Sequence, residues 1–315
     1  MSDIHNLIIS EGIVSASNQV EGRAGKSLVK IAASILSEES QAIGMTYSGF
    51  CLTSLPHNKL PDDQIWERHG HNIRLVIDPG LIDINGKSVR IGVPYGINAR
   101  IILYYLQTKA VKSRSPKIEL GGSFAEWIRR MGLSDGGKQR ENLAEQIKRI
   151  SACNLVFFWK TEEAKGMKRS AFVNEFIMLD SKRSSNDNGW RNEITLNEDF
   201  FKSLVDHPVP IWEPAVIALK NKSMAFDIYI WLAYRLHVLT KATPITWSAI
   251  QDQFGAGFST VRSFRQKFKE SLEFAKAVYP DACVDVTETG VTLYPSRPPV
   301  DHKVMVSLAG KARAR

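Results

Sequence analysis

The sequence predicts an α+β fold, mainly helical, with two tandem winged helix-turn-helix domains. Three observations lead to this prediction: one order of secondary-structure elements occurs twice, a glycine turn precedes a basic helix in each pass, and the chain is basic overall. With 41 Lys and Arg against 33 Asp and Glu, the 315-residue chain has a formal net charge of +8. A chain of this length can bury two hydrophobic cores without disulfides or structural metals.

The first pass starts with a segment that is apolar on nearly every side, which predicts a buried helix. Ser123 is a typical N-cap for the second helix of this pass. The expected elements are a helix at Ile97–Val111, a strand at Lys117–Leu120, a helix from Ser123 to Gly132, a turn at Gly136-Gly137, a basic helix at Lys138–Ser151, and strands at Asn154–Trp159 and Ala171–Leu179.

The second pass repeats this order after residue 210. The expected elements are a buried helix at Met224–Leu239, a strand at Pro244–Thr246, a helix at Trp247–Gln253, a turn at Gly255-Ala256-Gly257, a basic helix at Ser259–Val278, and a hairpin of Cys283–Val286 with Val291–Tyr294. Two helices across a turn, followed by a β-hairpin, have the order of a winged helix-turn-helix.

The predicted domain organisation follows from these two passes. Residues 1–44 form an N-terminal extension that is partly disordered, with a short helix at Lys26–Leu36. Residues 45–205 and 206–300 form the first and second winged-helix domains, and residues 301–315 form a basic tail. Within the first domain, Asn85-Gly86 predicts a tight β-hairpin because both residues adopt positive φ readily.

The helix at Ser259–Val278 has the features of a recognition helix. Val261, Phe264 and Phe268 recur at helical spacing and predict its buried stripe. A recognition helix places its first turns in the major groove, where Arg pairs with guanine and Gln with adenine. The predicted DNA-binding residues are Ser259, Arg262, Ser263, Arg265, Gln266, Lys267 and Lys269. The alternative is an ordinary solvated amphipathic helix.

The helix at Lys138–Ser151 is a weaker candidate for DNA contact. Its expected outer face includes Arg149 and two acids, Glu141 and Glu145, which repel phosphates. The predicted contacts lie mainly at its start and are Lys138, Gln139, Arg140 and Asn142. The basic connection at residues 165–169 predicts a wing, with Lys168 and Arg169 beside the phosphate backbone, and the alternative is a flexible basic loop.

No catalytic, cofactor or metal site is predicted. Gly25-Lys26-Ser27 has the end of a phosphate-loop motif, but Val20 replaces the first glycine. His69-Gly70-His71 with Tyr104-Tyr105 has the residue types of a rolling-circle nicking enzyme, but the histidines have loop-like neighbours and the tyrosines lie on an apolar helix. The three cysteines are isolated from one another, as expected for reduced thiols in the cytoplasm. Neither a signal peptide nor a membrane-spanning segment is predicted.

Several long strings resemble the plasmid-encoded RepA replication initiators, over roughly residues 45–300. They are VPYGINARIILYYLQTKAV (93–111), IELGGSFAEWIRRMGLSDGG (118–137), ISACNLVFFW (150–159), HPVPIWEPAVIAL (207–219), SMAFDIYIWLAYRLHVLTKATPITWSAIQDQFGAGF (223–258) and VTLYPSRPPV (291–300).

The resemblance implies a bacterial, plasmid-associated protein of the cytoplasm that binds repeated double-stranded DNA sites at an origin. Proteins of this kind promote opening of the origin, recruit the host initiator protein and the replicative helicase, and control copy number, often as dimers that repress their own gene. Tandem winged helices also fit the resemblance, and no catalytic residue or cofactor carries over. A transcriptional repressor of the same fold is the principal alternative function.

Overall fold

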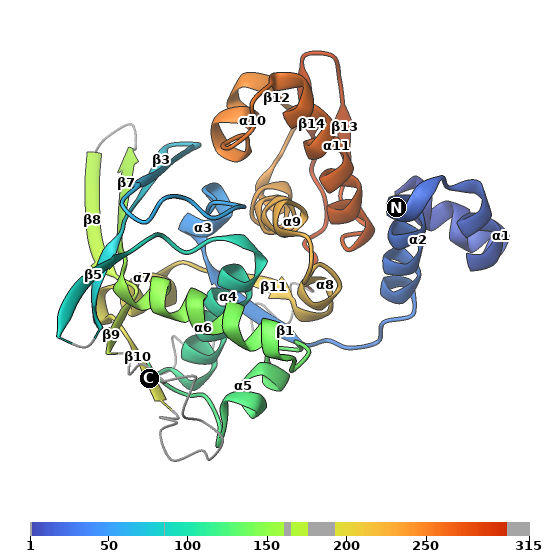
Figure 1. Cartoon of the computed structure of the whole chain (residues 1–315). Coiled ribbons are helices and arrows are strands. Elements are labelled where there is room, and N and C mark those ends of the chain that lie inside the picture. Colours follow the sequence, from blue (N-terminus) through green and yellow to red (C-terminus); the bar gives the residue numbers. More distant parts are fainter. Residues whose placement is uncertain (1, 85, 161–164, 176–192, 301–315) are drawn as a thin grey trace, which may run out of the picture. The chain divides into compact units, whose positions relative to one another are not determined.

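A computed structural model of the chain describes residues 2–84, 86–160, 165–175 and 193–300 (Figure 1). The chain divides into two compact units. We call Met45–Pro208 the central unit, and Met1–Gly44 together with Val209–Arg315 the terminal unit. Within the described residues, no helix has both the length and the hydropathy needed to cross a bilayer.

The elements of the central unit come in the order β1 (Ile43–Tyr47, which begins before the boundary), α3 (Ser48–Leu52), β2 (Trp66–Gly70), β3 (Ile73–Asp78), β4 (Gly80–Ile84), β5 (Lys87–Ile91), α4 (Gly96–Ser113), β6 (Lys117–Glu119), α5 (Phe124–Arg130), α6 (Gly137–Ala152), β7 (Asn154–Lys160), β8 (Lys165–Ala171), β9 (Val173–Glu175), β10 (Glu193–Leu196) and α7 (Glu198–Asp206). Helix α4 is buried over most of its length, as its uniform apolar sequence predicts.

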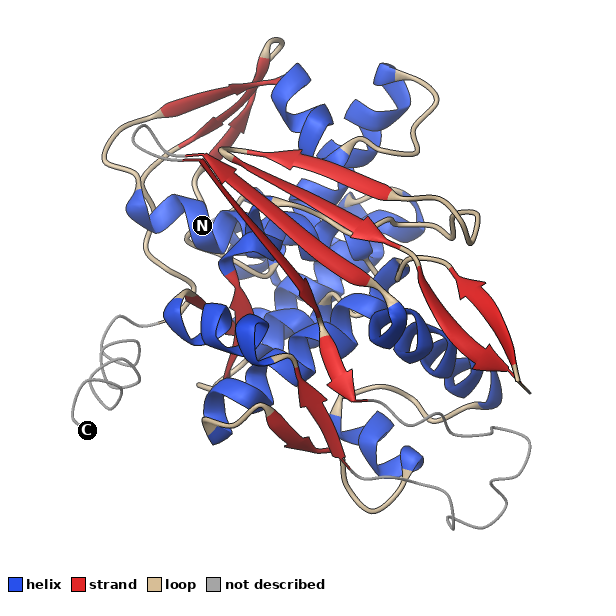
Figure 2. Ribbon diagram, turned by 90° about the vertical axis from the view of Figure 1, so that its left-hand side faces the viewer, coloured by secondary structure: helices blue, strands red, loops and turns tan. Residues whose placement is uncertain are grey.

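The strands of the central unit form antiparallel sheets (Figure 2). One sheet has the order β2-β3-β7-β8, a second has the order β6-β10-β9, and β4 pairs with β5 as a hairpin. The hairpin prediction is confirmed: Gly86 has a φ of 76°, and the Asp83 carboxylate accepts a hydrogen bond from its N–H at 3.1 Å. Asn85 lies outside the described residues.

Two strand predictions for this unit are wrong. The basic segment at residues 165–169, expected as a connecting loop, lies in β8 and pairs with β7. The expected strand at Ala171–Leu179 is divided between the end of β8 and β9, and its residues 176–179 lie outside the described part. Pairing with β7, the strand immediately before it in the chain, stabilises the backbone of the basic segment, although its Lys and Gly residues have low β-propensity.

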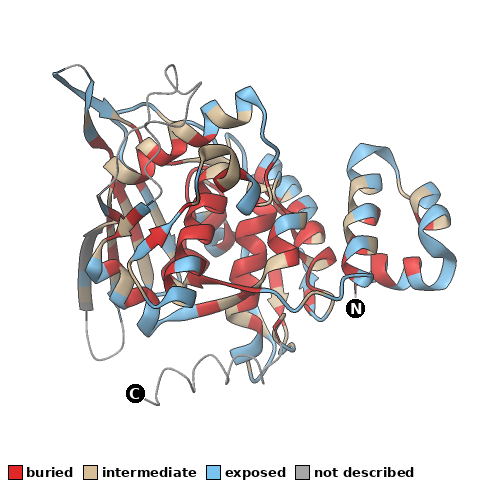
Figure 3. Ribbon diagram, turned by 90° about the horizontal axis from the view of Figure 1, so that it is seen from below, coloured by how far each residue is buried: buried red, intermediate tan, exposed pale blue. Residues whose placement is uncertain are grey.

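The elements of the terminal unit are α1 (Asp3–Gln19), α2 (Gly22–Leu36), β11 (Pro208–Trp212, which begins before the boundary), α8 (Glu213–Ala218), α9 (Ser223–Arg235), the 3-10 helix η1 (Leu236–Val238), β12 (Thr243–Thr246), α10 (Trp247–Phe254), α11 (Val261–Ala277), β13 (Val284–Val286) and β14 (Gly290–Leu293). Buried residues occupy most of α9 (Figure 3). The inner side of α11 is also buried. Strands β12, β14 and β13 form one antiparallel sheet in that order.

The described residues before β1 are more helical than the expected, partly disordered extension, in which only Lys26–Leu36 was predicted as a helix. They form α1 and α2, which share a small core with the end of α11. The His5 ring, which is fully buried, lies 3.0 Å through Nε2 from the carbonyl oxygen of Ala277. A left-handed φ of 81° at Gly12 interrupts α1, and this interruption weakens its helical pattern in the sequence.

The incomplete phosphate-loop motif Gly25-Lys26-Ser27 lies inside α2. Backbone N–H groups in a helix interior are hydrogen-bonded to carbonyl oxygens four residues earlier, so they cannot surround a phosphate. The helical position supports the prediction that this segment is not a nucleotide-binding loop.

Candidate nucleic-acid interface

Helices α10 and α11 are joined by a short turn, and each has a side-chain N-cap. The Thr246 hydroxyl accepts a hydrogen bond from the N–H of Ala249, and the Thr260 hydroxyl accepts one from the N–H of Ser263 at 3.1 Å. Gly257 in the turn has a φ of 83°, a conformation that favours glycine. The cap shows that α11 begins at Val261, so Ser259 precedes the helix that was expected to include it.

Aromatic packing sets the rotation of α11 about its axis. Phe264 and Phe268 are fully buried, and the Phe268 ring contacts the rings of Trp247 and Phe254. The sequence also predicted a buried Val261, but this side chain is 46% exposed. Val261 is the first residue of the helix and lies beyond the aromatic core that encloses the next two turns.

The face of α11 opposite this core exposes Arg262, Ser263 and Gln266. Ser263 stabilises the start of the helix, because its hydroxyl donates to the carbonyl oxygen of Thr260 at 2.9 Å. Within the described residues, Arg262 and Gln266 have no side-chain hydrogen bond or ion pair. They are four residues apart, so both point away from the core on adjacent turns.

The three other cations of this region have different surroundings. The Arg265 guanidinium lies 5.2 Å from the centre of the Trp247 ring, and the Lys269 ammonium lies 5.8 Å from the same ring. Both distances are within the range of a cation–π interaction. Lys267 instead forms an ion pair of 3.1 Å with Glu270, which partly neutralises its charge.

Trp247 connects α11 to the β13–β14 hairpin. Its residue surface is 4% exposed, and its backbone N–H donates to the carbonyl oxygen of Thr289 in the turn of the hairpin at 3.1 Å. The sequence correctly predicted that Trp247 packs in the core, but it did not show that the indole also supports Arg265 and Lys269. The sequence feature that could have indicated this support is the position of Trp247, the first residue of α10, which is the helix before the basic helix α11.

Two of the corresponding side chains at the start of α6 form hydrogen bonds with other side chains of the central unit. The Gln139 amide donates to the Asn98 side chain at 3.1 Å. Arg140 forms two hydrogen bonds with Asp135, of 2.5 and 2.9 Å, and this contact lowers the pKa of the Asp135 carboxyl. Of the predicted contacts on this helix, Lys138 and Asn142 are exposed.

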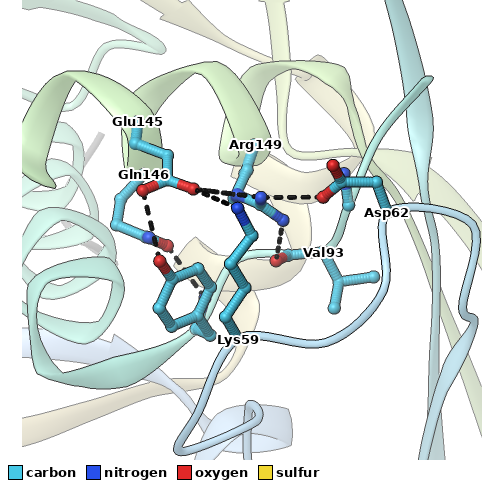
Figure 4. Close-up of polar contacts among 8 residues, drawn as sticks. Lys59, Asp62, Val93, Glu145, Gln146 and Arg149 are labelled. Atoms are coloured by element: carbon cyan, nitrogen blue, oxygen red, sulfur yellow. Dashed lines mark hydrogen bonds and ion pairs between the residues drawn. The ribbon is translucent and has the colours of Figure 1, made fainter.

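The second half of α6 is tied to the rest of the central unit by Arg149 (Figure 4). The Arg149 guanidinium lies 2.8 Å from an Asp62 oxygen and 3.0 Å from a Glu145 oxygen, and it donates to the Val93 carbonyl at 3.3 Å. Its side chain is 3% exposed, so its predicted position on the outer face is wrong. Residues 62 and 93 are distant in sequence and cover this side of the helix.

Charge balance keeps this cluster together. Glu145 also pairs with Lys59 at 3.4 Å and accepts a hydrogen bond from the Tyr95 hydroxyl at 3.2 Å. Desolvation alone acts to raise the pKa of Asp62, but the hydrogen bond and charge of Arg149, the charge of Lys59 and the N–H of Gly92 together outweigh it, so the pKa is lowered. Glu145, predicted to repel phosphates, is therefore occupied by neighbouring cations and a hydroxyl.

The predicted wing residues Lys168 and Arg169 belong to the backbone of β8, where they pair with Phe157 and Val156 of β7. Their side chains lie outside the described part of the structure. The predicted basic tail at residues 301–315 also lies outside it.

The residues considered for nicking chemistry lie on different elements of the central unit. His69 lies in strand β2 rather than in a loop and contacts Glu67 at 2.9 Å. Tyr104 and Tyr105 are buried in α4. Within the described residues, no group of three or more His, Cys, Asp and Glu side chains could hold a metal ion.

Comparisons with known proteins identify a family and a similar fold. The family model for plasmid encoded RepA protein matches residues 93–249. A crystal structure of selenomethionine derivatives of domains 2 and 3 of RctB is similar with a TM-score of 0.50 and 14% identity, over 81% of this chain and 99% of that chain. A second crystal structure of RctB domains 2-3 has a TM-score of 0.45 and 13% identity, over 77% and 93% of the two chains. No curated protein matches the chain significantly.

Proposed function

Because residues 93–249 of this chain belong to the plasmid encoded RepA protein family, we propose that the protein initiates plasmid replication by binding repeated double-stranded DNA sites at the origin. The observation that carries the proposal is the exposed face of α11. Arg262 and Gln266 lie there on adjacent turns, opposite a fixed aromatic core and directly after a capped turn.

The terminal unit supplies a complete winged helix in this proposal. The order α9, β12, α10, α11, β13, β14, with the sheet order β12-β14-β13, places a hairpin after the second helix of the pair. In winged helix-turn-helix proteins, the second helix of the pair enters the major groove. Helix α11 is then the recognition helix, and the β13–β14 hairpin is the wing.

The roles on α11 divide between base readout and phosphate contact. Arg262 and Gln266 are free to make bidentate contacts, Arg with guanine and Gln with adenine. Arg265 and Lys269, supported by Trp247, lie on the flank of the helix and contact phosphates, which set orientation without reading sequence. Ser263 stabilises the start of the helix through its hydrogen bond to the N-cap residue Thr260 rather than reading bases.

The central unit is proposed to have a second winged helix, with α6 as its helix of contact. Only Lys138 and Asn142 among its predicted residues are exposed without a partner in the described part of the chain. We therefore assign α6 a supporting contact with the phosphate backbone and assign most base readout to α11.

The remaining steps of initiation follow from the family. We propose that the bound protein promotes opening of the origin, recruits the host initiator protein and the replicative helicase, and controls copy number, with a homodimer as the repressing form. The protein is not an enzyme in this proposal, and it acts in the cytoplasm where the plasmid is.

DNase I footprinting of the full chain on the plasmid region around its own gene tests the proposal. The expected result is protection of repeated sites, together with replication of a plasmid that carries this region only when the protein is supplied. Protection of a single site with no effect on replication would identify a repressor. The absence of any protected site would overturn the proposal.

A further inference from the structure

Helix α2 carries a row of cations that the proposed recognition helix does not use. Arg23, Lys26 and Lys30 are all exposed. Successive residues of a helix are separated by about 100°, so these three side chains fall on one face. Ala32 and Ile35, on the opposite face, are buried. The packing of α2 therefore holds the cations outward.

The charge of this face is not balanced within the helix. The sequence of α2 contains no acid, and the acids nearest in sequence are Glu21 before it and Glu38 and Glu39 after it. In the described part of the chain, none of the three cations forms an ion pair. Lysines on α11 differ, since Lys267 and Lys276 pair with Glu270 and Glu273.

The cationic row is attached to α11 by a defined contact. The α1–α2 pair packs on the end of α11 through the core that includes Ala277, and His5 lies within hydrogen-bond distance of the Ala277 carbonyl. Helix α11 has 17 residues, so its two ends are about 25 Å apart. The row is thus held within the terminal unit, near the end of α11 opposite to Arg262.

Double-stranded DNA matches both the charge and the spacing of this row. Arg23 and Lys30 are seven residues apart, about 10 Å along the helix axis. A duplex carries about one phosphate charge per 1.7 Å of its axis, so several phosphates fall within that length. An approaching duplex therefore offers each of the three cations a partner.

We propose that the cationic row of α2, formed by Arg23, Lys26 and Lys30, is a second and sequence-independent DNA contact of the terminal unit. It binds phosphates of the duplex that flanks the site read by α11. This inference rests on the proposed function and extends it, because it gives the N-terminal helices a role that base readout does not require.

The test compares two charge-matched variants of the full chain on a random-sequence duplex of 60 base pairs. The first is Arg23→Gln/Lys26→Gln/Lys30→Gln, and the control is Lys87→Gln/Lys202→Gln/Lys241→Gln, which removes three exposed cations elsewhere. Fluorescence anisotropy from 50 to 200 mM salt gives the dependence of log affinity on log salt. We expect the α2 variant to reduce this slope by about two to three and the control to reduce it by less than about one.

A gain-of-charge variant keeps the test decisive if the triple variant does not fold. Ser34 is exposed on the same face of α2, and Ser34→Lys is expected to increase the slope by about one. Equal slopes for the α2 variant and the control, with thermal melts like that of the original chain, would overturn the proposal.

Two further results separate this proposal from the alternatives. Loss of binding to phosphatidylglycerol vesicles in the α2 variant, with an unchanged slope on DNA, would overturn it in favour of a membrane surface. Failure of the original chain to protect any site in the footprint would overturn the proposed function, whereas an altered slope on random DNA would still support the α2 contact. The two failures are therefore distinguishable.

Discussion

The helix pairs α5–α6 and α10–α11 have the same place in the order of elements but use their second helix differently. At the start of α6, Gln139 and Arg140 are bound to Asn98 and Asp135. At the start of α11, Arg262 and Gln266 point outward, and neither has a partner in the described residues. Polar side chains at the start of α6 therefore stabilise the fold of the chain itself. Those at the start of α11 are exposed and can contact a binding partner.

The sheets beside the two helix pairs also differ. Strand β12 pairs with β14 of the hairpin that follows α11, so helix pair and hairpin form one module. In the central unit, β6 pairs with β10, and the β7–β8 hairpin joins a sheet with β2 and β3. The helix pair α5–α6 is thus surrounded by more strands than α10–α11. This arrangement fits a supporting contact of α6 with the DNA backbone better than base readout by α6 on its own.

The largest expected effect on stability comes from a substitution in the aromatic core that orients α11. Phe268 is fully buried against Trp247, Phe254 and Phe264. Phe268→Ala should reduce the free energy of unfolding by about 3–5 kcal/mol, because it removes a large side chain and leaves a cavity. Chemical denaturation followed by tryptophan fluorescence measures this change. A variant as stable as the original chain would show that the core does not determine the rotation of α11.

The second prediction tests how much the Arg149 cluster of α6 contributes to the stability of the fold. Arg149→Met should reduce the free energy of unfolding by about 2–3 kcal/mol, because its charge-assisted hydrogen bonds are lost while apolar volume is kept. This expected loss of stability is smaller than the loss on breaking a fully buried ion pair, because the Asp62 side chain is 50% exposed and can be hydrated. Chemical denaturation measures the loss, and Lys148→Met, on the same helix, is the control. A cost equal to that of the control would contradict the structural role of Arg149.

These two residues also show how far the sequence predicts the structure. Phe264 and Phe268 recur at helical spacing, which predicts a buried stripe. The segments of α4 and α9 are apolar on nearly every side, which predicts that both helices are buried. Arg149 was misplaced because its partners, Asp62 and Val93, are 87 and 56 residues away in sequence. Periodicity describes one helix, whereas the burial of a charged side chain depends on the segments that pack against it.

The candidate site shows the same limit. Arg262 and Gln266 were predicted correctly as exposed, because the aromatic stripe opposite them is local to α11. The support that Trp247 gives to Arg265 and Lys269 was not predicted, since it joins α10 to α11 through tertiary packing. Of the N-terminal helices, α2 was predicted in part as Lys26–Leu36, whereas α1 was missed for a similar reason: it is weakly patterned and is stabilised by its contacts with α2 and Ala277.

The third effect compares one arginine from each helix. Arg262→Ala should weaken binding to the footprinted site by about 1–3 kcal/mol and relax the preference at one base pair. Arg140→Ala should change that affinity by less than about 0.5 kcal/mol, because its guanidinium is already bound to Asp135. Binding assays on the specific and scrambled duplexes measure both. Thermal melts should be nearly unchanged for Arg262→Ala, since it is exposed.

The result would also decide between the two units. Equal losses for Arg262→Ala and Arg140→Ala would show that Asp135 releases Arg140 when DNA binds and that both helices read bases. An unchanged specificity ratio for Arg262→Ala would show that α11 meets DNA in another orientation than the exposed face indicates.

The smallest expected effect distinguishes two lysines of α11 by their partners. Lys269 is exposed beside the Trp247 ring, whereas Lys267 is paired with Glu270 at 3.1 Å. A lysine that contacts a phosphate contributes about one unit to the salt dependence of binding. Lys269→Ala should therefore lower the slope by about one on specific and random DNA alike. Lys267→Ala should lower it by less, because Lys267 is already paired with Glu270 in the original chain and contributes little phosphate contact of its own. Lys267→Ala/Glu270→Ala isolates this difference: if the ion pair persists in the complex, the double variant should bind random DNA as the original chain does. A full unit lost in the double variant would instead show that Lys267 leaves Glu270 and contacts a phosphate directly.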